Sequence, residues 1–209
     1  MSNKLAVIDI DSTICNLLKC YQSYVGTGMS IEDAKTYVLS QSVNLSEEDH
    51  RAQWNMFWES DAFMMAETCH QSEEALYGFK GLGYTIILLT QRWPKSRAGT
   101  EHWLRMNNLM YDHLAMIGIQ GDSKIKNDGL THKAAYIRDK LPRDSVAFVV
   151  DDHADIVRDT SEKLRLESYL VDMPYNRHLK CSEKSRRVNT LYEVYKLLDI
   201  KNRKGLQNE

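Results

Sequence analysis

The chain has 209 residues, enough for one core domain with a sizeable insertion, and its hydrophobic content of 43% is ordinary for a globular protein. The formal net charge of -2 gives no overall sign of a nucleic-acid or anionic-membrane surface, so we do not expect stable nucleic-acid binding. No apolar stretch is long enough to span a bilayer, and the first residues lead into a predicted strand, not into a secretory signal. We therefore expect a cytoplasmic protein that does not bind membranes.

Five short apolar runs predict the strands of a sheet. They are residues 5–8, 85–89, 114–117, 146–150 and 169–171. Helical patterns separate the last four runs, and this alternation is typical of a parallel sheet with helices on both faces. The predicted fold class is α/β, a Rossmann-like parallel sheet flanked by helices.

Two acidic residues, Asp9 and Asp11, directly follow the first run. In open α/β sheets, ligands bind beyond the carboxyl ends of the strands. Two neighbouring carboxylates repel each other unless a cation, hydrogen bonds or a retained proton offsets the repulsion, and a divalent metal is the simplest offset. The alternative is a plain turn in which Asp9 caps the next helix.

The long segment between the first and second runs predicts an inserted domain, because it far exceeds one crossover connection. Ser-x-x-acid patterns at residues 30–33 and 46–49 predict two helix starts, and Ile31, Ala34 and Val38 would share one face of the first helix. We assign residues 16–70 to a small α-helical cap, 1–15 and 71–200 to the catalytic core, and 201–209 to a flexible tail. A set of large apolar residues would form the cap core or its contact with the sheet, or else an aromatic wall facing a substrate: Trp54, Phe57, Trp58, Phe63, Met64 and Met65.

Further polar residues fall at or just after the predicted strand ends or at a helix start. Thr90 follows the second run, Lys133 lies at a predicted helix N-terminus, and Asp151-Asp152 follow the run 146–150, with Asp155 close behind. Each has a structural alternative as a cap, a solvated side chain or a helix start. Together with the Asp pair, they supply every part that metal-assisted phosphoryl transfer needs.

At these residues the sequence resembles the haloacid dehalogenase (HAD) superfamily of phosphohydrolases. The resemblance covers residues 4–15 and 80–175, with four motifs in the family's order: Asp9-Ile10-Asp11-Ser12-Thr13, Leu88-Leu89-Thr90, Lys133 and Val149-Val150-Asp151-Asp152. The insertion looks like the family's C1 cap. Position 12 is Ser where many members have Gly, a departure that some relatives share.

The resemblance implies a role for each motif. Asp9 would attack phosphorus to give an aspartyl-phosphate. Asp11 would protonate the leaving oxygen and later deprotonate the attacking water, and its backbone carbonyl would reach the metal. The expected cofactor is Mg²⁺, which prefers oxygen ligands.

Ligands and phosphate donors are assigned in the same way. Asp9, Asp11, Asp151 and Asp152 would hold Mg²⁺, with Asp152 as a ligand or as a partner that orients one. Thr90, Gln91 and Lys133 would bind the transferring phosphoryl group.

The segment 173–177, Met-Pro-Tyr-Asn-Arg, is similar to a Pro-aromatic-Asn segment of 5'(3')-deoxyribonucleotidases in this superfamily. Residues 83–92 and the Asp151-Asp152 segment resemble the phosphatase half of phage polynucleotide kinase-phosphatases. These likenesses favour a nucleotide or a nucleic-acid end as the substrate, with Arg92, Tyr175 and Asn176 as candidate contacts. Two basic clusters, one after Thr90 and one that includes Arg186 and Arg187, are typical of solvated surfaces and lack the interleaved aromatics of a single-strand binding groove, so we expect a small phosphorylated substrate, a nucleotide. The alternatives are a 3'-phosphatase on nucleic-acid ends or a phosphatase of another small metabolite. The sequence leaves the oligomeric state open.

Two further hypotheses for the function involve no hydrolytic turnover. A receiver domain also places acids, Thr and Lys around a parallel sheet, but its phospho-accepting Asp precedes the Thr and Lys, whereas Asp151-Asp152 come last here. A silent phospho-binding protein on the same fold is the other, since a fold does not guarantee turnover.

Overall fold

The computed structural model describes residues 4–118 and 128–206. In this part of the chain, six strands form one parallel sheet in the order β3-β2-β1-β4-β5-β6. The strands are β1 Lys4–Ile8, β2 Tyr84–Thr90, β3 His113–Met116, β4 Val146–Asp151, β5 Glu167–Val171 and β6 Ser185–Val188. The predicted fold class is confirmed, and each of the predicted apolar runs overlaps one of these strands.

The sequence does not predict β6, which pairs with β5 at the edge of the sheet. Its sequence is Ser-Arg-Arg-Val, and Arg186 and Arg187 read as part of a solvated basic cluster. Charged side chains are common on edge strands, where they discourage pairing with other chains. A prediction that identifies strands by apolar runs therefore misses this edge strand.

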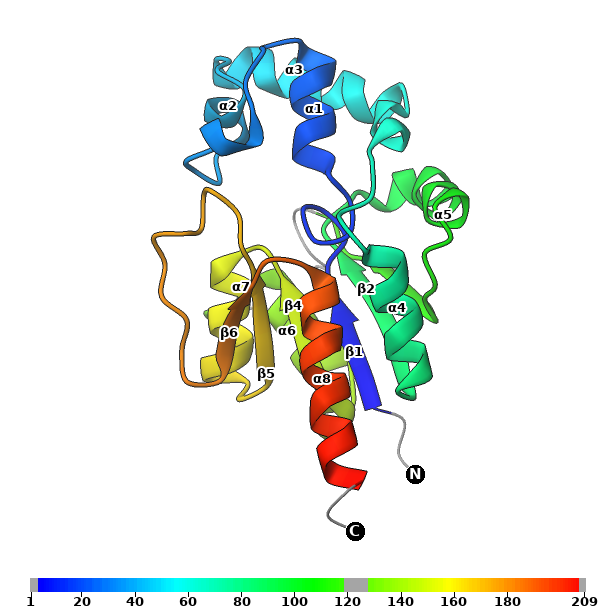
Figure 1. Cartoon of the computed structure of the whole chain (residues 1–209). Coiled ribbons are helices and arrows are strands. Elements are labelled where there is room, and N and C mark those ends of the chain that lie inside the picture. The colour runs from blue at the N-terminus through cyan, green and yellow to red at the C-terminus, as the bar shows by residue number, and fades with distance from the viewer. Residues whose placement is uncertain (1–3, 119–127, 207–209) are drawn as a thin grey trace.

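Helices cover both faces of the sheet (Figure 1). Residues of α4, α5 and α8 pack in the larger core cluster on one face, and residues of α6 pack with Val7, Leu89 and Val149 on the other. The α-helices are α1 Leu17–Val25, α2 Leu39–Ser42, α3 Glu47–Glu59, α4 Ser72–Gly81, α5 Arg97–Met106, α6 His132–Lys140, α7 Ala154–Arg158 and α8 Leu191–Leu206. Short 3-10 turns are η1 Ile31–Asp33, η2 Ala62–Met65, η3 Pro94–Ser96 and η4 Arg143–Ser145, and a π-helical turn η5 Asp159–Lys163 continues α7.

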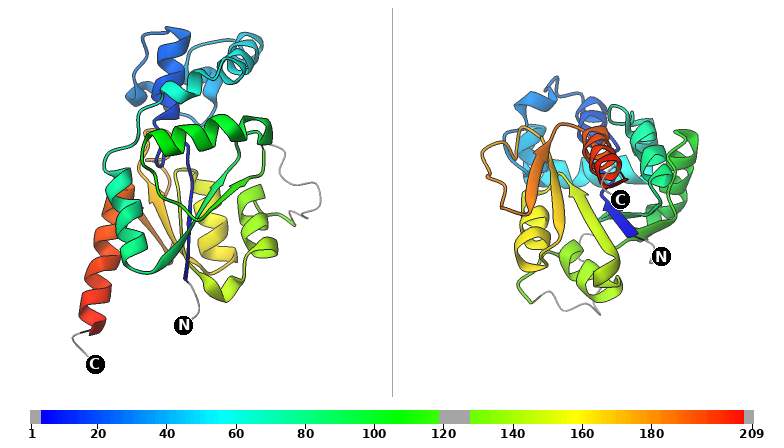
Figure 2. Two further views of the ribbon diagram at one scale, coloured as in Figure 1. Left: turned by 90° about the vertical axis from the view of Figure 1, so that its right-hand side faces the viewer. Right: turned by 60° about the horizontal axis from the view of Figure 1, so that its bottom comes forward.

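The strand order reverses direction between β1 and β4, which are neighbours in the sheet. Loops diverge at such a switch point and leave a crevice at the carboxyl ends of the strands, where ligands bind in open α/β sheets. The insertion, from α1 to η2, lies over this edge, opposite the chain termini (Figures 1 and 2). None of the helices in the described ranges has both the length and the apolar character to cross a membrane.

The two ends of the insertion run side by side. The backbone amide of Asn16 donates to the carbonyl of Glu67, and that of Cys69 donates to the carbonyl of Ile14, both at 2.9 Å. Cys15 and Thr68 form an antiparallel bridge between these bonds. The insertion therefore leaves and rejoins the core through one short paired stem.

The predicted helix start at Ser46 is confirmed by α3. The Ser46 hydroxyl accepts a hydrogen bond from the Asp49 amide at 3.1 Å, and acidic residues in the first turn favour the positive end of the helix dipole.

The predicted helix from Ser30 is wrong in extent. Ser30 and Asp33 form a capping box, but only the 3-10 turn η1 follows, and the next helix is the short α2. The chain between them places Tyr37 against His153 and Tyr175 of the core, with ring centroids 4.0 and 5.1 Å away. These tertiary contacts outweigh the local helix signal.

The predicted cap core is confirmed for the side chains of Phe57, Trp58 and Phe63, which are buried, whereas Met65 is 82% exposed. Met65 ends the short turn η2, so helical spacing from α3 does not apply to it. At the other end of the chain, α8 continues through Leu206, where we predict a flexible tail from residue 201. Residues 207–209 of that tail lie outside the described ranges.

Candidate active site

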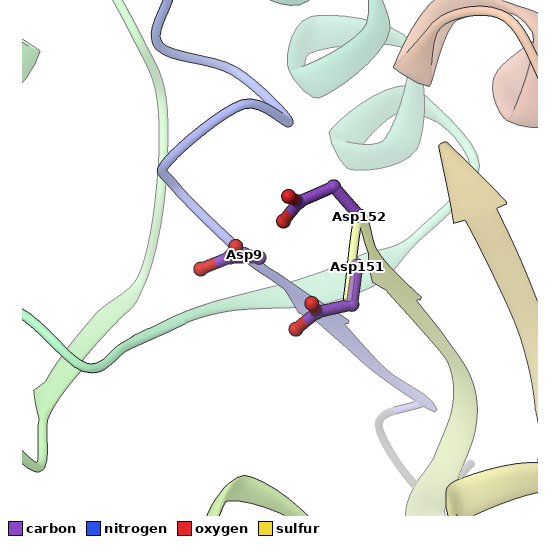
Figure 3. A group of neighbouring side chains, drawn as sticks. All are labelled: Asp9, Asp151 and Asp152. Carbon is purple, nitrogen blue, oxygen red and sulfur yellow. The ribbon is translucent and has the colours of Figure 1, made fainter. Parts of the chain in front are cut away.

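Three carboxylates meet at the switch point. Asp9 follows β1, Asp151 ends β4 and Asp152 comes next, and one carboxylate oxygen from each lies within 4.8 Å of the others (Figure 3). The Asp9 amide donates to the Val150 carbonyl at 2.9 Å, which extends the pairing of β1 with β4 by one residue. All three acids are at most 5% exposed. The register of two central strands thus gathers the acids that the sequence places at separate strand ends.

Burial and mutual repulsion make the ionised cluster unfavourable on its own. Burial is the main cause that raises the pKa of Asp9 well above its ordinary value, with the ammonium of Lys133 opposing it. Burial and then the charge of Asp151 raise the pKa of Asp152 to about 7. The site therefore favours either bound protons or a bound cation.

Lys133 supplies one positive charge inside the cluster. Its ammonium lies 2.6 Å from Asp9 Oδ1 and 2.8 Å from Asp151 Oδ2, and its side chain is 5% exposed. Burial alone would lower the pKa of Lys133, but the two carboxylates outweigh burial and raise it. Lys133 lies in the first turn of α6, as predicted, and this helix carries it to the end of β4.

Asp152 is held from the loop after β5. The Tyr175 hydroxyl donates to Asp152 Oδ2 in a short hydrogen bond, and the Asn176 amide donates to the carbonyls of Asp152 and Val171, both at 2.8 Å. We expect substrate contacts from Tyr175 and Asn176, but Asn176 is 2% exposed and its amide binds the protein backbone. The structure places both residues as supports of Asp152, with the Tyr175 ring also facing a cavity.

Asp11 points to a different partner from the other acids. Its carboxylate accepts hydrogen bonds from Arg92 Nε at 3.1 and 3.2 Å and from Arg92 Nη2 at 2.7 Å. The Thr90 hydroxyl lies 3.4 Å from Asp11 Oδ2 and accepts a bond from the Arg92 amide at 3.1 Å. Arg92, predicted as a substrate contact, anchors Asp11 and also lines the cavity beside it, and the Thr90 hydroxyl lies close to both residues.

The turn that carries Asp11 has an unusual backbone. Ser12 has φ of 61°, in the left-handed region, and its amide donates to the Cys15 carbonyl at 2.7 Å. Glycine adopts this conformation at lower cost, which accounts physically for the glycine that many members of the resembled family carry here.

A cavity of about 300 Å³ opens beside Asp11, between the insertion and the core. Its walls include the aromatic side chains of Tyr37, Trp54 and Trp93. The charged groups in its lining are Asp11 and Arg92, which pair with each other. Gln91, predicted to bind the phosphoryl group, also lines this cavity.

Asp155 lies apart from the cluster. Its side chain is 49% exposed and pairs with Arg158 at 2.9 Å. Its backbone amide donates to His153 Nδ1 at the start of α7. This geometry fits the structural alternative, a favourable charge in the first helical turn.

The carboxylate cluster fits a divalent cation. Three carboxylates face one ammonium, and Asp152 Oδ1 is buried with no hydrogen-bond partner among the described residues. Buried polar atoms are normally paired, so an unpartnered carboxylate oxygen aimed into an acidic cluster suits a metal ligand. Asp9, Asp151 and Asp152 could hold the ion.

Sequence reasoning misses the groups around Arg92. Thr100 accepts a bond from Arg92 Nη1 at 3.2 Å, and the rings of Trp58, Phe63 and Trp103 surround the guanidinium. These residues come from the insertion and from α5, and their spacing along the chain carries no sign that they meet.

No protein-family model and no curated protein matches the sequence. Several solved structures are similar to this chain in fold. One is described as a predicted phosphatase from Clostridium acetobutylicum, 14% identical, with a TM-score of 0.62 over 95% of this chain and 99% of that one. Another is described as the HAD-hydrolase YfnB from Bacillus subtilis bound to magnesium, 10% identical, with a TM-score of 0.57 over 95% of this chain and 100% of that one.

A third similar structure is described as the Pnkp1/Rnl/Hen1 RNA repair complex. The match is 20% identical, with a TM-score of 0.52, and covers 82% of this chain. It covers 43% of the chain in that complex, so this protein spans less than half of that relative's length. Together the matches show that the chain has the fold of the HAD-superfamily hydrolases.

Proposed function

We propose that this chain, which has the HAD fold, is a Mg²⁺-dependent phosphomonoesterase that works through an aspartyl-phosphate, and that its substrates are nucleoside monophosphates. The observation that carries the proposal is the cluster of Asp9, Asp151 and Asp152 within 4.8 Å, with the Lys133 ammonium between two of them. A nucleophile, a cation site and a fixed positive charge are thus adjacent at the switch point of the sheet.

Asp9, Asp151 and Asp152 would hold Mg²⁺. The ion would offset the charge of the carboxylates and of the phosphoryl oxygens. Tyr175 and Asn176 would keep Asp152 in place, since their bonds fix its carboxylate and its backbone.

Two displacements complete the reaction. A carboxylate oxygen of Asp9 forms a bond to phosphorus as the bond to the ester oxygen breaks, and Asp11 gives that oxygen its proton. Asp11 then takes a proton from water, whose oxygen bonds to phosphorus as the bond to Asp9 breaks. The products are the free alcohol and inorganic phosphate, and both acids return to their starting state.

Lys133 would stabilise negative charge in both displacements. Its ammonium pairs with Asp9 and Asp151, which orients the nucleophile and keeps positive charge next to the phosphoryl group. The Thr90 hydroxyl lies by Asp11, where it can bind either a phosphoryl oxygen or the acid itself.

The cavity beside Asp11 supports a nucleoside as the leaving group. It has about 300 Å³ and aromatic walls that include Tyr37, Trp54 and Trp93, which suits a flat, uncharged ring system. Its charged residues, Asp11 and Arg92, neutralise each other. Among the described residues, the lining thus offers no unpaired cation for a second phosphate.

Phosphate removal from nucleic-acid ends is the second candidate. It is favoured by the likeness of the fold to a chain in the RNA repair complex and by the sequence likeness of residues 83–92 to polynucleotide kinase-phosphatases. A 3'-phosphorylated oligonucleotide distinguishes it from a nucleotidase.

The test is phosphate release by the purified chain. The substrates are p-nitrophenyl phosphate, a panel of 5'- and 3'-nucleoside monophosphates and the 3'-phosphorylated oligonucleotide, each with Mg²⁺ and with a chelator. We expect turnover that needs Mg²⁺, with mononucleotides preferred. Preference for the oligonucleotide would select the second candidate.

Asp9→Asn and Asp155→Asn form a matched pair of variants. We expect the first to lower kcat by at least about a thousandfold, because it removes the nucleophile. The second should stay within about twofold of wild type, because the Asp155 side chain is about half exposed, pairs with Arg158 and is not one of the three clustered acids. Equal activity of Asp9→Asn and wild type would refute the mechanism.

A further inference from the structure

Arg92 is an enclosed cation next to the proposed proton donor. Its side chain is 1% exposed, and its Nε and Nη2 groups donate to Asp11 at 2.7 to 3.2 Å. Nη1 donates to the Thr100 hydroxyl, and Nη2 also lies 3.3 Å from Cys15 Sγ. All these partners are protein groups, so the guanidinium is fixed in direction by its surroundings.

Three aromatic rings enclose the guanidinium of Arg92. Its central carbon lies 5.4 Å from the centroid of the Trp58 ring, 5.3 Å from that of Phe63 and 5.7 Å from that of Trp103. Cations at this distance are attracted to ring faces, and the attraction grows when water is excluded. We call these three residues the aromatic cage.

The cage spans the junction between the insertion and the core. Trp58 belongs to α3 and Phe63 to η2, whereas Trp103 belongs to α5. The Trp103 indole donates to the carbonyl of Ala66 at 2.8 Å, and the absent side chain of Gly99 lets α5 approach Phe63. The position of the insertion on α5 therefore sets where two of the three rings lie.

We propose that Trp58 and Phe63 of the insertion are positioning residues that act through Arg92 to aim the Asp11 carboxyl at the leaving oxygen. The inference rests on the proposed function, because it concerns the same acid. Asp11 lies on a tight turn whose carboxylate is held by Arg92 from one side, so a shift of the guanidinium shifts the acid. The insertion thereby contributes to proton transfer as well as to the cavity wall.

Two aryl phosphates of nearly equal shape test this role. The p-nitrophenolate ion leaves readily without a proton, whereas phenolate is the poorer leaving group and depends more on a proton donor. A misplaced Asp11 should therefore slow phenyl phosphate more than p-nitrophenyl phosphate. A variant that merely loosens the fold would slow both esters equally.

Phe63→Leu and Phe57→Leu are the matched variants. Both shorten a fully buried phenylalanine of the insertion, but of these two only Phe63 belongs to the aromatic cage around Arg92. We expect Phe63→Leu to lower kcat for phenyl phosphate about tenfold more than for p-nitrophenyl phosphate, and Phe57→Leu to leave that ratio unchanged. Trp58→Leu should change the ratio too, and Trp58→Phe, which keeps a ring, should restore it.

A second readout needs no turnover. The Arg92 Nε–H signal in ¹⁵N NMR spectra, assigned by its loss in Arg92→Lys, should exchange slowly with water in the wild type and about tenfold faster in Phe63→Leu. Phe57→Leu should leave it unchanged. An unchanged ester ratio, or unchanged exchange in Phe63→Leu, would overturn the proposal. If the wild type hydrolyses neither ester, the proposed function fails, and the exchange rates still decide whether the cage positions Arg92.

Discussion

The ammonium of Lys133 lies 2.6 Å from the carboxylate of Asp9, although Lys133 belongs to the first turn of α6 and Asp9 follows β1. Both side chains are buried, and Asp151 completes the ion cluster on the other side of the ammonium. Removing one member of a buried ion pair leaves an uncompensated charge, which costs more than the pair contributes when intact.

Lys133→Met should therefore destabilise the metal-free protein by about 3 to 5 kcal/mol, measured as the free energy of unfolding in urea. Lys140→Met is the control, because Lys140 is exposed at the end of the same helix and should change that free energy by about 0.5 kcal/mol or less. Equal effects of the two substitutions would show that the ion cluster does not hold α6 to the sheet.

Magnesium should stabilise the protein more at pH 8 than at pH 5.5. Burial and the charge of Asp151 raise the pKa of Asp152 from 3.8 to about 7, so the metal-free folded state keeps a proton that the unfolded chain has lost. Stability from this group therefore falls as pH rises from 3.8 to about 7. A bound cation favours the ionised carboxylate, so its stabilisation grows over the same interval.

Urea unfolding with Mg²⁺ and with a chelator at both pH values measures this difference. At a Mg²⁺ concentration of about a hundred times its Kd, the expected stabilisation is about 2.7 kcal/mol at pH 8. Asp152→Asn should reduce the pH-dependent part, because the amide does not titrate, and the share that comes from the raised pKa of Asp9 should stay. The same Mg²⁺ effect at both pH values would contradict the assignment of Asp152 to the cation site.

Arg187 should support the cation site from the edge strand. It donates to the carbonyls of Asn176 and Leu179 at 3.0 and 2.7 Å and to Asp172 at 2.9 Å, and Asn176 in turn holds the Asp152 carbonyl. We expect Arg187→Gln to lower the free energy of unfolding by about 2 kcal/mol and to weaken Mg²⁺ binding about tenfold, measured by calorimetric titration.

Its neighbour on β6 is the control for this prediction. Arg186 is exposed, so Arg186→Gln should change neither quantity appreciably. Equal Mg²⁺ affinities of the two variants would show that the loop after β5 does not influence Mg²⁺ binding.

Gly99→Ala should disturb the contact between α5 and the insertion. An added methyl would lie 2.7 Å from Phe63 Cζ, closer than such atoms approach, so the ring or the helix must move. We expect a loss of about 1 to 3 kcal/mol in the free energy of unfolding, together with a lower kcat. Gly81→Ala, at a helical glycine with open space around it, should instead be neutral or raise that free energy by up to about 1 kcal/mol.

The sequence predicts the meeting of Asp9 with Asp151 because of a general property of parallel sheets. Acids placed at the carboxyl ends of adjacent strands must lie at one edge, and a continuous apolar run marks each strand. The sequence also predicts the helix N-terminus at which Lys133 lies. These parts of the site follow from local patterns and one topological rule.

The surroundings of Asp11 are not predictable in this way. Arg92 meets Phe63 only because the insertion docks on α5, and docking depends on side-chain shape at a site such as Gly99. Local propensity is also overruled at Tyr37, whose contacts with core rings interrupt the predicted helix. Such contacts join distant parts of the chain and leave no periodic signal.

The two ends of the insertion pair with each other at residues 14–16 and 67–69, so the whole insertion could be replaced at this stem in the course of evolution. An exchange of everything between these residues would leave the sheet register and the carboxylate cluster untouched, so descendants could change the wall of the cavity without rebuilding that cluster. Any such replacement would still have to supply apolar rings for the guanidinium beneath it, and that requirement restricts which modules could be grafted there.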